Sequence, residues 1–152
     1  DFAKAKLEDI FSKDKLRSAD QFVAYHFANT IFINQGNGNF KPQILPWEAQ
    51  ITAYKTASVC DANGDNLPDI ILMGNYFDNN VQMGRYDADY GTVLINKGKG
   101  QFEVSPFNGL SVKGQVRNMS PIKIGASAQQ HFVLAMNSDS VRLIQIKKPD
   151  SK

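Results

Sequence analysis

The chain repeats one short pattern at a spacing of 62 residues. The segment Ile31–Phe40 reads IFINQGNGNF and the segment Val93–Phe102 reads VLINKGKGQF, so the offset is 93 − 31 = 62. Each copy has an apolar run, an Asn, a Gly-x-Gly turn and a Phe, which predicts a strand, a turn with positive φ and an outgoing strand. Self-similarity at a fixed spacing is typical of repeat folds, in which each unit buries its faces against its neighbours. We therefore expect two equivalent β-hairpins in an all-β repeat fold.

A second motif places oxygen-bearing side chains at alternate positions of one loop. Residues 61–69 read DANGDNLPD. The candidate ligands are the side chains of Asp61, Asn63, Asp65 and Asp69 and the backbone carbonyl of Leu67. Ca²⁺ takes about six to eight oxygen ligands, and these donors can converge on one ion. Gly64 and Asn66 tolerate the left-handed backbone that wraps such a loop. The motif predicts a calcium site.

An EF-hand and a polar β-turn are the two alternatives to a calcium loop between strands. An EF-hand needs Gly at the sixth position, Glu at the twelfth and a helix on each side, whereas this chain has Asn66 and Leu72 there. The flanks Ile51–Cys60 and Asp69–Met73 are β-branched and apolar without a 3.6-residue period, so the loop joins two strands. The alternative is a polar β-turn without metal, because Asp, Asn, Gly and Pro are common in turns. Four oxygen donors in register favour the metal site.

The two motifs together resemble the FG-GAP/VCBS repeat of β-propellers, which also occurs in integrin α-chain propellers and many bacterial surface proteins. In that family the Asp-rich loop binds Ca²⁺ between the first two strands of a blade, which implies a structural ion in the 61–69 loop. The resemblance covers most of the chain from about Asn29 onward. The stretch GRYDADYGTVLINKGKGQF, residues 84–102, also resembles the final blades of large VCBS-repeat proteins from environmental bacteria.

The length and the resemblance together imply a partial propeller with one calcium ion. The third unit has Ala126–Gln130 and Asn137–Ser140 in place of an acidic loop. At 62 residues per unit, 152 residues hold about two and a half four-stranded antiparallel blades, and propellers usually have four to eight. We expect one propeller fragment over residues 1–152, with units near 21–50, 51–110 and 111–148, taken from the C-terminal part of a larger protein. Unpaired strand edges then predict either a covering helix or edge-to-edge self-association of the fragment.

The expected secondary structure begins with a single helix. Leu7, Ile10 and Phe11 fall on one helical face within Ala3–Asp20, which predicts a helix over about residues 3–18 that packs on a blade edge or replaces a missing strand. Strands are expected at 21–28, 30–34 and 39–44 in the first unit, at 51–60, 69–74, 91–96 and 101–105 in the second, and at 119–125, 131–136 and 141–147 in the third.

A long insertion separates the second and third strands of the middle unit. Asn75–Tyr90 is dense in polar and aromatic residues, and loops of this length are often functional. Asp87 and Asp89 share one face of an extended strand and are a candidate carboxylate pair for glycoside hydrolysis. An ion pair between Arg85 and one of these carboxylates is the competing interpretation, and we favour it. The alternative function is therefore a hydrolase or polysaccharide-acting domain that uses the 75–90 loop.

The other reactive side chains give no catalytic signature. His26 and His131 are the two histidines, and neither belongs to a nucleophile elbow or a zinc motif. Cys60 is the single cysteine, so no intrachain disulfide forms. A thiolate suits soft metals, whereas the neighbouring donors are hard oxygens, so we expect Cys60 to be a buried strand residue. We expect no catalytic residues.

Charge and hydropathy exclude some classes of partner. The net charge is +2, and Lys97 with Lys99 or Lys147 with Lys148 lack the interleaved aromatics of a nucleic-acid surface. The longest apolar run is far shorter than the roughly 20 residues of a transmembrane helix. A calcium loop suits a calcium-rich surrounding, and the resemblance implies a periplasmic, cell-surface or secreted protein. The predicted function is a non-catalytic, calcium-binding interaction scaffold of an exported bacterial protein, with a protein or carbohydrate ligand.

Overall fold

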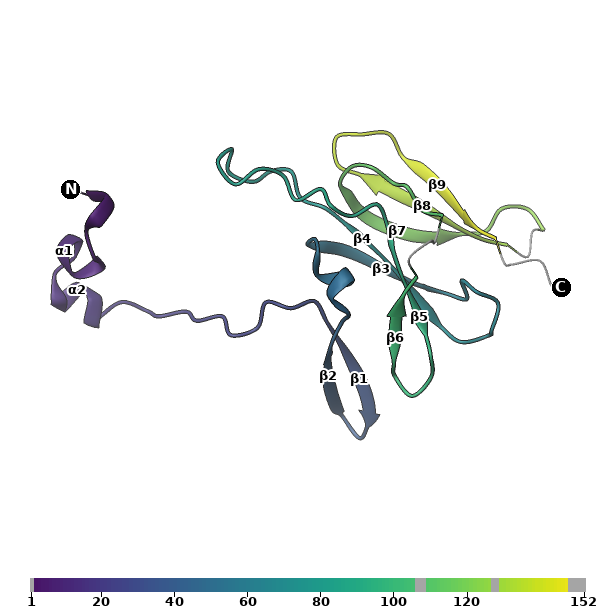
Figure 1. Cartoon of the computed structure of the whole chain (residues 1–152), viewed down its shortest axis with the longest axis horizontal. Helices are drawn as coiled ribbons and strands as arrows, with labels where there is room; N and C mark the ends of the chain where they lie inside the picture. The colour runs from purple at the N-terminus through teal and green to yellow at the C-terminus, as the bar shows by residue number, and fades with distance from the viewer. Residues whose placement is uncertain (1, 106–108, 127–128, 148–152) are drawn as a thin grey trace.

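The fold consists of three antiparallel β-sheets that follow one another along the chain (Figure 1). The structure, a computed structural model, describes residues 2–105, 109–126 and 129–147. The first unit is the hairpin of β1 (Thr30–Gly36) and β2 (Asn39–Ile44). The second unit has the strand order β3 (Tyr54–Cys60), β4 (Asp69–Gly74), β5 (Thr92–Asn96) and β6 (Phe102–Val104). The third unit has the order β7 (Val116–Ile122), β8 (Gln130–Met136) and β9 (Arg142–Ile146).

The all-β expectation is confirmed, and the strands lie close to the predicted segments from residue 30 onward. Strand β3 has one half-buried face, with Tyr54, Thr56 and Ser58, and one exposed face, because successive side chains of a strand point to opposite sides. The continuous apolar run of β4 is instead covered along its whole length, because this strand lies in the interior between neighbouring sheets. Among the described strands, no sheet closes on itself.

The two Gly-x-Gly hairpins are equivalent, as predicted. Asn34 pairs with Phe40 across the first hairpin, and Asn96 pairs with Phe102 across the other. In each copy the Asn side chain bends the chain into the turn: Oδ1 of Asn34 and of Asn96 accepts a hydrogen bond of 2.8 Å from the backbone N–H two residues on. The repeated sequence therefore encodes a repeated strand, turn and strand.

The same 62-residue spacing also relates β3 to β7, which share no obvious sequence pattern. Tyr54 and Val116 are the first residues of these strands, and 116 − 54 = 62. The pairing of β3 with β4 shifts register between residues 54 and 56, and the pairing of β7 with β8 shifts between residues 116 and 118. A β-bulge at the same place of both units shows that the repeat extends over whole sheets rather than over the hairpins alone.

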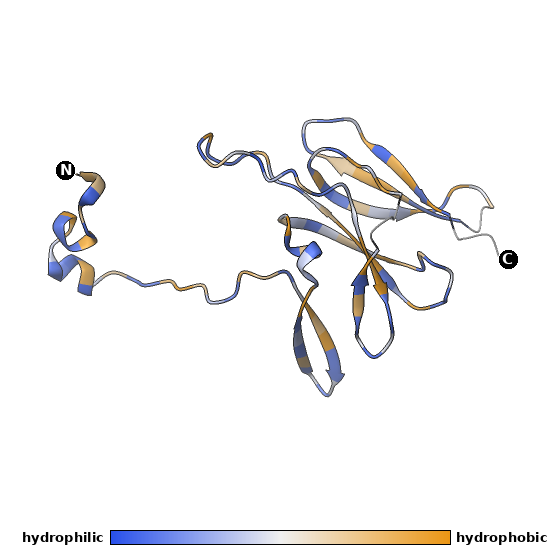
Figure 2. Cartoon of the chain, in the orientation of Figure 1, coloured by the Kyte–Doolittle hydropathy of each residue, from blue (hydrophilic) through white to orange (hydrophobic). Residues whose placement is uncertain are grey.

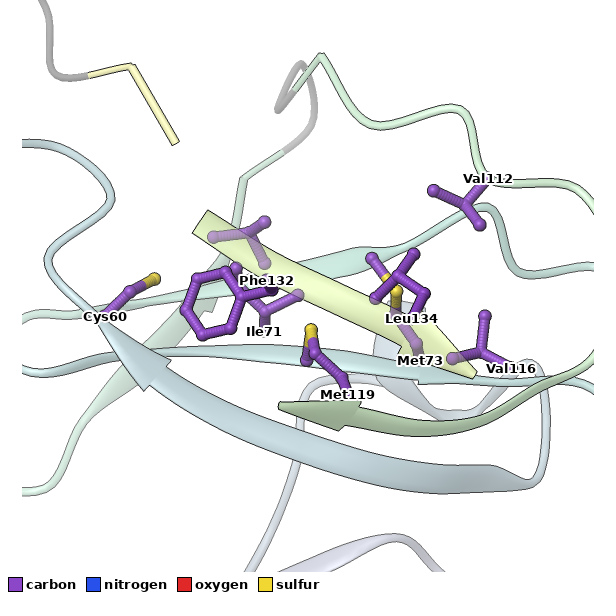
Figure 3. Close-up of a cluster of buried hydrophobic side chains, with 9 residues drawn as sticks. Cys60, Ile71, Met73, Val112, Val116, Met119, Phe132 and Leu134 are labelled. Atoms are coloured by element: carbon purple, nitrogen blue, oxygen red, sulfur yellow. The ribbon is translucent and has the colours of Figure 1, made fainter. Parts of the chain in front are cut away.

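The main hydrophobic core lies between the second and third units (Figure 3). Ile71 and Met73 of β4 pack there against Phe132 and Leu134 of β8, and all four side chains are buried. The complete set of buried residues in this cluster is Cys60, Ile71, Met73, Val93, Val112, Val116, Met119, Phe132 and Leu134. The apolar faces of the second and third sheets are thus buried against each other.

A smaller core joins the first and second units. Leu72 and Leu94 point from the opposite face of the second sheet toward Leu45 and Ala49, with Ile31 of β1 packed against them. Adjacent residues of a strand point to opposite faces, so Ile71 belongs to one core and Leu72 to the other. The second unit is therefore buried on both faces.

The expected N-terminal helix over residues 3–18 is wrong. Three short pieces take its place: η1 (Phe2–Lys4), α1 (Leu7–Ile10) and α2 (Lys13–Arg17), and none contains a buried residue. Phe11 is extended, with φ −117° and ψ 142°, and ends α1 after one turn. Helices this short are marginal in water without a surface to pack on. The pieces lie apart from the sheets, so none of these three covers a sheet edge (Figure 1).

The strand expected at 21–28 is also absent. These residues form an extended segment with Phe22, Tyr25 and Phe27 exposed, and Figure 2 shows its hydrophobic residues uncovered by any sheet. Only Asn29 separates the segment from β1, and a two-residue loop is the shortest common hairpin connection. The segment therefore cannot fold back onto β1.

Two asparagines at different positions of the repeat, Asn29 before β1 and Asn75 after β4, each donate to a backbone carbonyl of the following unit. The Asn29 amide donates to the carbonyl oxygen of Thr52 at 3.1 Å, and the Asn75 amide donates to that of Gly114 at 3.0 Å. The two acceptors are repeat equivalents, since 114 − 52 = 62. Asn75 is buried with φ +74°, and its Oδ1 also accepts from the Thr52 hydroxyl and the Asp89 N–H. We call this contact the inter-unit amide clamp.

The clamp at Asn75 predicts a large stability cost on substitution. Asn75→Ala leaves several buried polar groups without partners and adds left-handed backbone strain, so we expect about 3–5 kcal/mol of destabilisation in denaturant unfolding. Asn37→Ala is the matched control, because Asn37 has φ +52° but is exposed, and it should cost about 1–2 kcal/mol. Equal losses in the two variants would contradict the clamp.

Candidate metal site

The acidic loop connects β3 to β4 at one end of the second sheet. Gly64 and Asn66 adopt left-handed backbone, with φ +83° and +65°, as the sequence predicts. This backbone turns the chain within the few residues between the two strands, so that the alternate side chains of the loop lie near one another. The loop is exposed along residues 63–68, whereas its last residue, Asp69, is buried as the first residue of β4.

Side-chain oxygens of the loop accept hydrogen bonds from the backbone of the loop itself. Asp61 Oδ1 accepts from the Gly64 N–H at 2.7 Å, Asn63 Oδ1 from the Asp65 N–H at 3.0 Å, and Asp65 Oδ1 from the Leu67 N–H at 2.8 Å. Asp65 Oδ2 also accepts from the Asn63 amide at 2.8 Å. These local bonds hold the alternate oxygens on the inner side of the turn.

Asp69 ties the loop to the rest of the sheet. Its Oδ2 accepts from the Ala62 N–H at 2.9 Å, and its Oδ1 accepts from the Asn96 N–H of β5 at 2.8 Å. The Asn96 amide in turn donates to the Pro68 carbonyl at 3.0 Å. The sequence identifies Asn96 only as a repeated turn residue. Its part in holding the acidic loop was missed, because the sequence does not show the register that brings Asn96 of β5 opposite the start of β4.

The chemistry of the donors fits a hard cation. Asp61, Asn63, Asp65 and Asp69 offer only oxygen ligands, which suit Ca²⁺ better than a soft metal. Within the described ranges, no three His, Cys, Asp or Glu side chains lie close enough together to hold a metal ion as arranged here. The donors share one loop, and binding an ion would require their carboxylate oxygens to move closer together than they lie here.

Cys60 lies beside the loop as a buried residue of β3, as expected. Burial, with the nearby charges of Asp69 and Asp61, raises the pKa of its thiol to about 11. The sulfur is therefore protonated near neutral pH, and a protonated thiol is a poor metal ligand.

Asp69 and Asp65 should respond differently to truncation in the absence of metal. Asp69→Ala leaves the N–H groups of Ala62 and Asn96 without their acceptor, so we expect about 2–4 kcal/mol of destabilisation in chelator. Asp65→Ala changes an exposed residue and should cost within about 0.5 kcal/mol under the same conditions. Denaturant unfolding followed by circular dichroism measures both, and equal losses would show that Asp69 has no structural role of its own.

The 75–90 insertion forms a projecting β-arm. Tyr76 and Tyr86 pair across it through two backbone hydrogen bonds of 2.9 Å. Arg85 lies over the Phe77 ring, 5.0 Å from its centroid. Asp78 forms an ion pair of 3.1 Å with Arg117 of β7, which connects the arm to the third unit.

The two carboxylates of the arm do not form an exposed pair. Asp87 is exposed, whereas Asp89 is 4% exposed and its Oδ1 accepts from the Thr92 hydroxyl at 2.8 Å. The expected ion pair of Arg85 with Asp87 or Asp89 is wrong for the described residues, where Arg117 and Asp78 form the arm's salt bridge instead. Arg85 stacks on an aromatic ring because guanidinium groups pack well on such faces.

Burial of Asp89 predicts a pH-dependent stability term. Desolvation raises the pKa of this carboxyl above its usual value, although the Thr92 hydroxyl bond opposes the shift. The folded state then binds the proton more readily than the unfolded state, so this contribution is present below the unfolded pKa of about 3.9 and is lost as pH rises through the folded pKa. Asp89→Asn keeps an acceptor for Thr92 and should reduce this loss. If the free energy of unfolding changed with pH equally in the wild type and in Asp89→Asn, the predicted contribution of Asp89 would be contradicted.

The acidic loop and the β-arm lie at opposite ends of the second sheet (Figure 1). Strand β4 is antiparallel to β3 and β5, so its first residue Asp69 adjoins the loop and its last residue Gly74 adjoins the arm. An ion in the loop therefore has no direct contact with the 75–90 insertion. The loop's neighbour is instead the Gly-x-Gly turn after Asn96.

The histidines lie outside both regions. His26 is exposed, with Nε2 2.6 Å from the Thr30 hydroxyl, and His131 is a half-buried residue of β8. Neither lies beside the carboxylates discussed above.

In comparisons with known proteins, no family model matches the chain, and no curated protein or solved structure matches it. The resemblance to FG-GAP/VCBS repeats thus rests on the two sequence motifs. Across the described part of the chain, no helix has the length and apolar character needed to cross a membrane.

Proposed function

We propose that the chain is a non-catalytic, calcium-binding module of FG-GAP/VCBS-like propeller blades that serves as an interaction scaffold. The observation that carries the proposal is the Asp61–Asp69 loop between β3 and β4, with oxygen donors at alternate positions and a buried Asp69 at its end. This is the place in a blade where the resembled family holds its ion.

The arrangement of the sheets supports the blade interpretation. Each unit is an antiparallel meander, and successive units pack face to face through two separate hydrophobic cores. Units related by a constant 62-residue offset, with a β-bulge at the same place, fit a radial array of blades.

The ion's role in this proposal is structural. Asp61, Asn63, Asp65 and Asp69, with the Leu67 carbonyl, would hold Ca²⁺, which would neutralise three carboxylates placed within nine residues. Because Asp69 also accepts from Asn96, the neutralised loop would hold the β5–β6 turn beside it. The scaffold surface would then consist of this end of the sheets.

A scaffold is favoured over a hydrolase because Asp89 is buried and bonded to Thr92 while Asp87 is exposed. A calcium-dependent fold also suits a periplasmic, cell-surface or secreted protein, where calcium is plentiful. We propose an exported protein as the setting and a protein or a carbohydrate as the ligand.

Calcium should stabilise the folded chain. The ion binds the folded loop and hardly the unfolded chain, so free Ca²⁺ at a hundred times its dissociation constant should add about 2.7 kcal/mol. Asp65→Ala removes a central ligand and should abolish most of this gain. The measurement is a pair of thermal melting curves for each protein, one with calcium and one with chelator.

Asp87→Ala is the matched control, because Asp87 is an exposed carboxylate at the opposite end of the sheet. It should keep the full calcium response. A wild-type chain that melts at the same temperature in calcium and in chelator would refute the metal site and leave the loop a polar turn.

A further inference from the structure

The repeat allows the faces of the third unit to be compared with those of the second. Ile71 pairs with Val93 across β4 and β5, and Val133 pairs with Leu143 across β8 and β9. Val133 follows Ile71 by 133 − 71 = 62 residues, so the two occupy equivalent positions of β8 and β4. Leu143 lies directly opposite Val133, as Val93 lies directly opposite Ile71, so Leu143 is the equivalent of Val93. In the same way Ile122 follows Cys60 by 62 residues at the end of the first strand.

In the second unit these positions are covered by the next unit. Cys60 is 3% exposed, Ile71 0% and Val93 4%, and all three belong to the core against the third sheet. In the third unit Ile122 is 43% exposed and Leu143 is 55% exposed. We call Ile122, Val133 and Leu143 the trailing face. It repeats the apolar character of a face that packs against a neighbouring unit, with Val133 half-buried between the exposed Ile122 and Leu143.

The first unit shows the complementary face. Leu94 and Phe102 of the second unit pack toward the first unit, and their equivalents 62 residues earlier are Phe32 and Phe40. These two aromatic side chains are 63% and 57% exposed. We call Phe32 and Phe40 the leading face. The molecule thus exposes a leading face and a trailing face, which are the two kinds of surface that pack together at both internal contacts between units.

A polar feature marks the trailing end as well. Asn137 follows Asn75 by 62 residues, at the end of the second strand of its unit. Asn75 donates its amide to the following unit, whereas no hydrogen bond of the Asn137 side chain is found among the described residues. The third unit therefore carries the residue with which the second unit clamps its successor.

We propose that a second copy of this chain docks its leading face on the trailing face, in a head-to-tail contact that repeats the packing of the first unit on the second. The occupant is a second copy because this chain itself exposes the matching face, with two aromatic residues where the internal contact uses Leu94 and Phe102. The interface is heterologous, so it produces dimers and larger assemblies as concentration rises. It does not depend on calcium or on pairing between strand edges.

A complementation experiment tests this contact. Phe32→Glu blocks the leading face and Leu143→Glu blocks the trailing face, and both residues are exposed in the single chain, so the fold should persist by circular dichroism. In sedimentation velocity the wild type should associate with rising concentration, whereas each variant alone should associate at least roughly tenfold more weakly. An equimolar mixture of the variants should form dimers but nothing larger, because each variant retains the face that the other has lost and the two blocked faces prevent further addition.

The controls separate this contact from other forms of association. Val81→Glu changes a 97% exposed residue of the β-arm and should leave association unchanged. Phe40→Glu with Ile122→Glu is a second pair that should behave like the first. A wild type that stays monomeric at every concentration, single variants that associate as the wild type does, or a mixture that stays monomeric would each overturn the proposal.

Discussion

The burial of β4 on both faces is the constraint on which the rest of the structure depends. Ile71 and Leu72 are neighbours in sequence but belong to different hydrophobic cores, one toward the third unit and one toward the first. A two-stranded hairpin or a single sheet has too little apolar surface to fold alone. The first and third units are therefore held by the second, and the acidic loop and the β-arm are held at the two ends of β4.

The sequence predicts the strands well and their partners less well. Gly-x-Gly turns after Asn34 and Asn96 specify hairpins locally, because the glycines supply the positive φ that other residues avoid. The equivalence of β3 and β7 is hidden, since many apolar sequences fit the same half-buried strand. Residues 21–28 look like a strand because their apolar content is right. A strand exists only where another strand pairs with it, and the sequence does not show that partner.

The conformation of the acidic loop is likewise predictable from local sequence, whereas its attachment to the sheet depends on contacts between residues far apart in the chain. Ligand spacing and left-handed positions are local properties, so the loop conformation is predictable from DANGDNLPD. The bond of Asp69 to Asn96 joins residues far apart in the chain and depends on the order of strands in the sheet. The β-arm lies at the opposite end of the sheet because the acidic loop and the arm adjoin the two ends of β4. Two loops that flank one strand in the sequence are therefore not neighbours in space.

The hydrogen bonds within the loop determine which effects a bound ion would add. Asp61, Asn63 and Asp65 already accept backbone N–H groups, and Asp69 already anchors the loop end. The backbone of the turn is therefore ordered without a cation, so ion binding does not have to offset the conformational entropy of ordering it. What the polypeptide does not supply is a positive charge among three carboxylates. An ion in this loop would act mainly by neutralising charge, and its effect would pass through Asp69 and Asn96 to the β5–β6 turn, while the β-arm is held independently by Asn75.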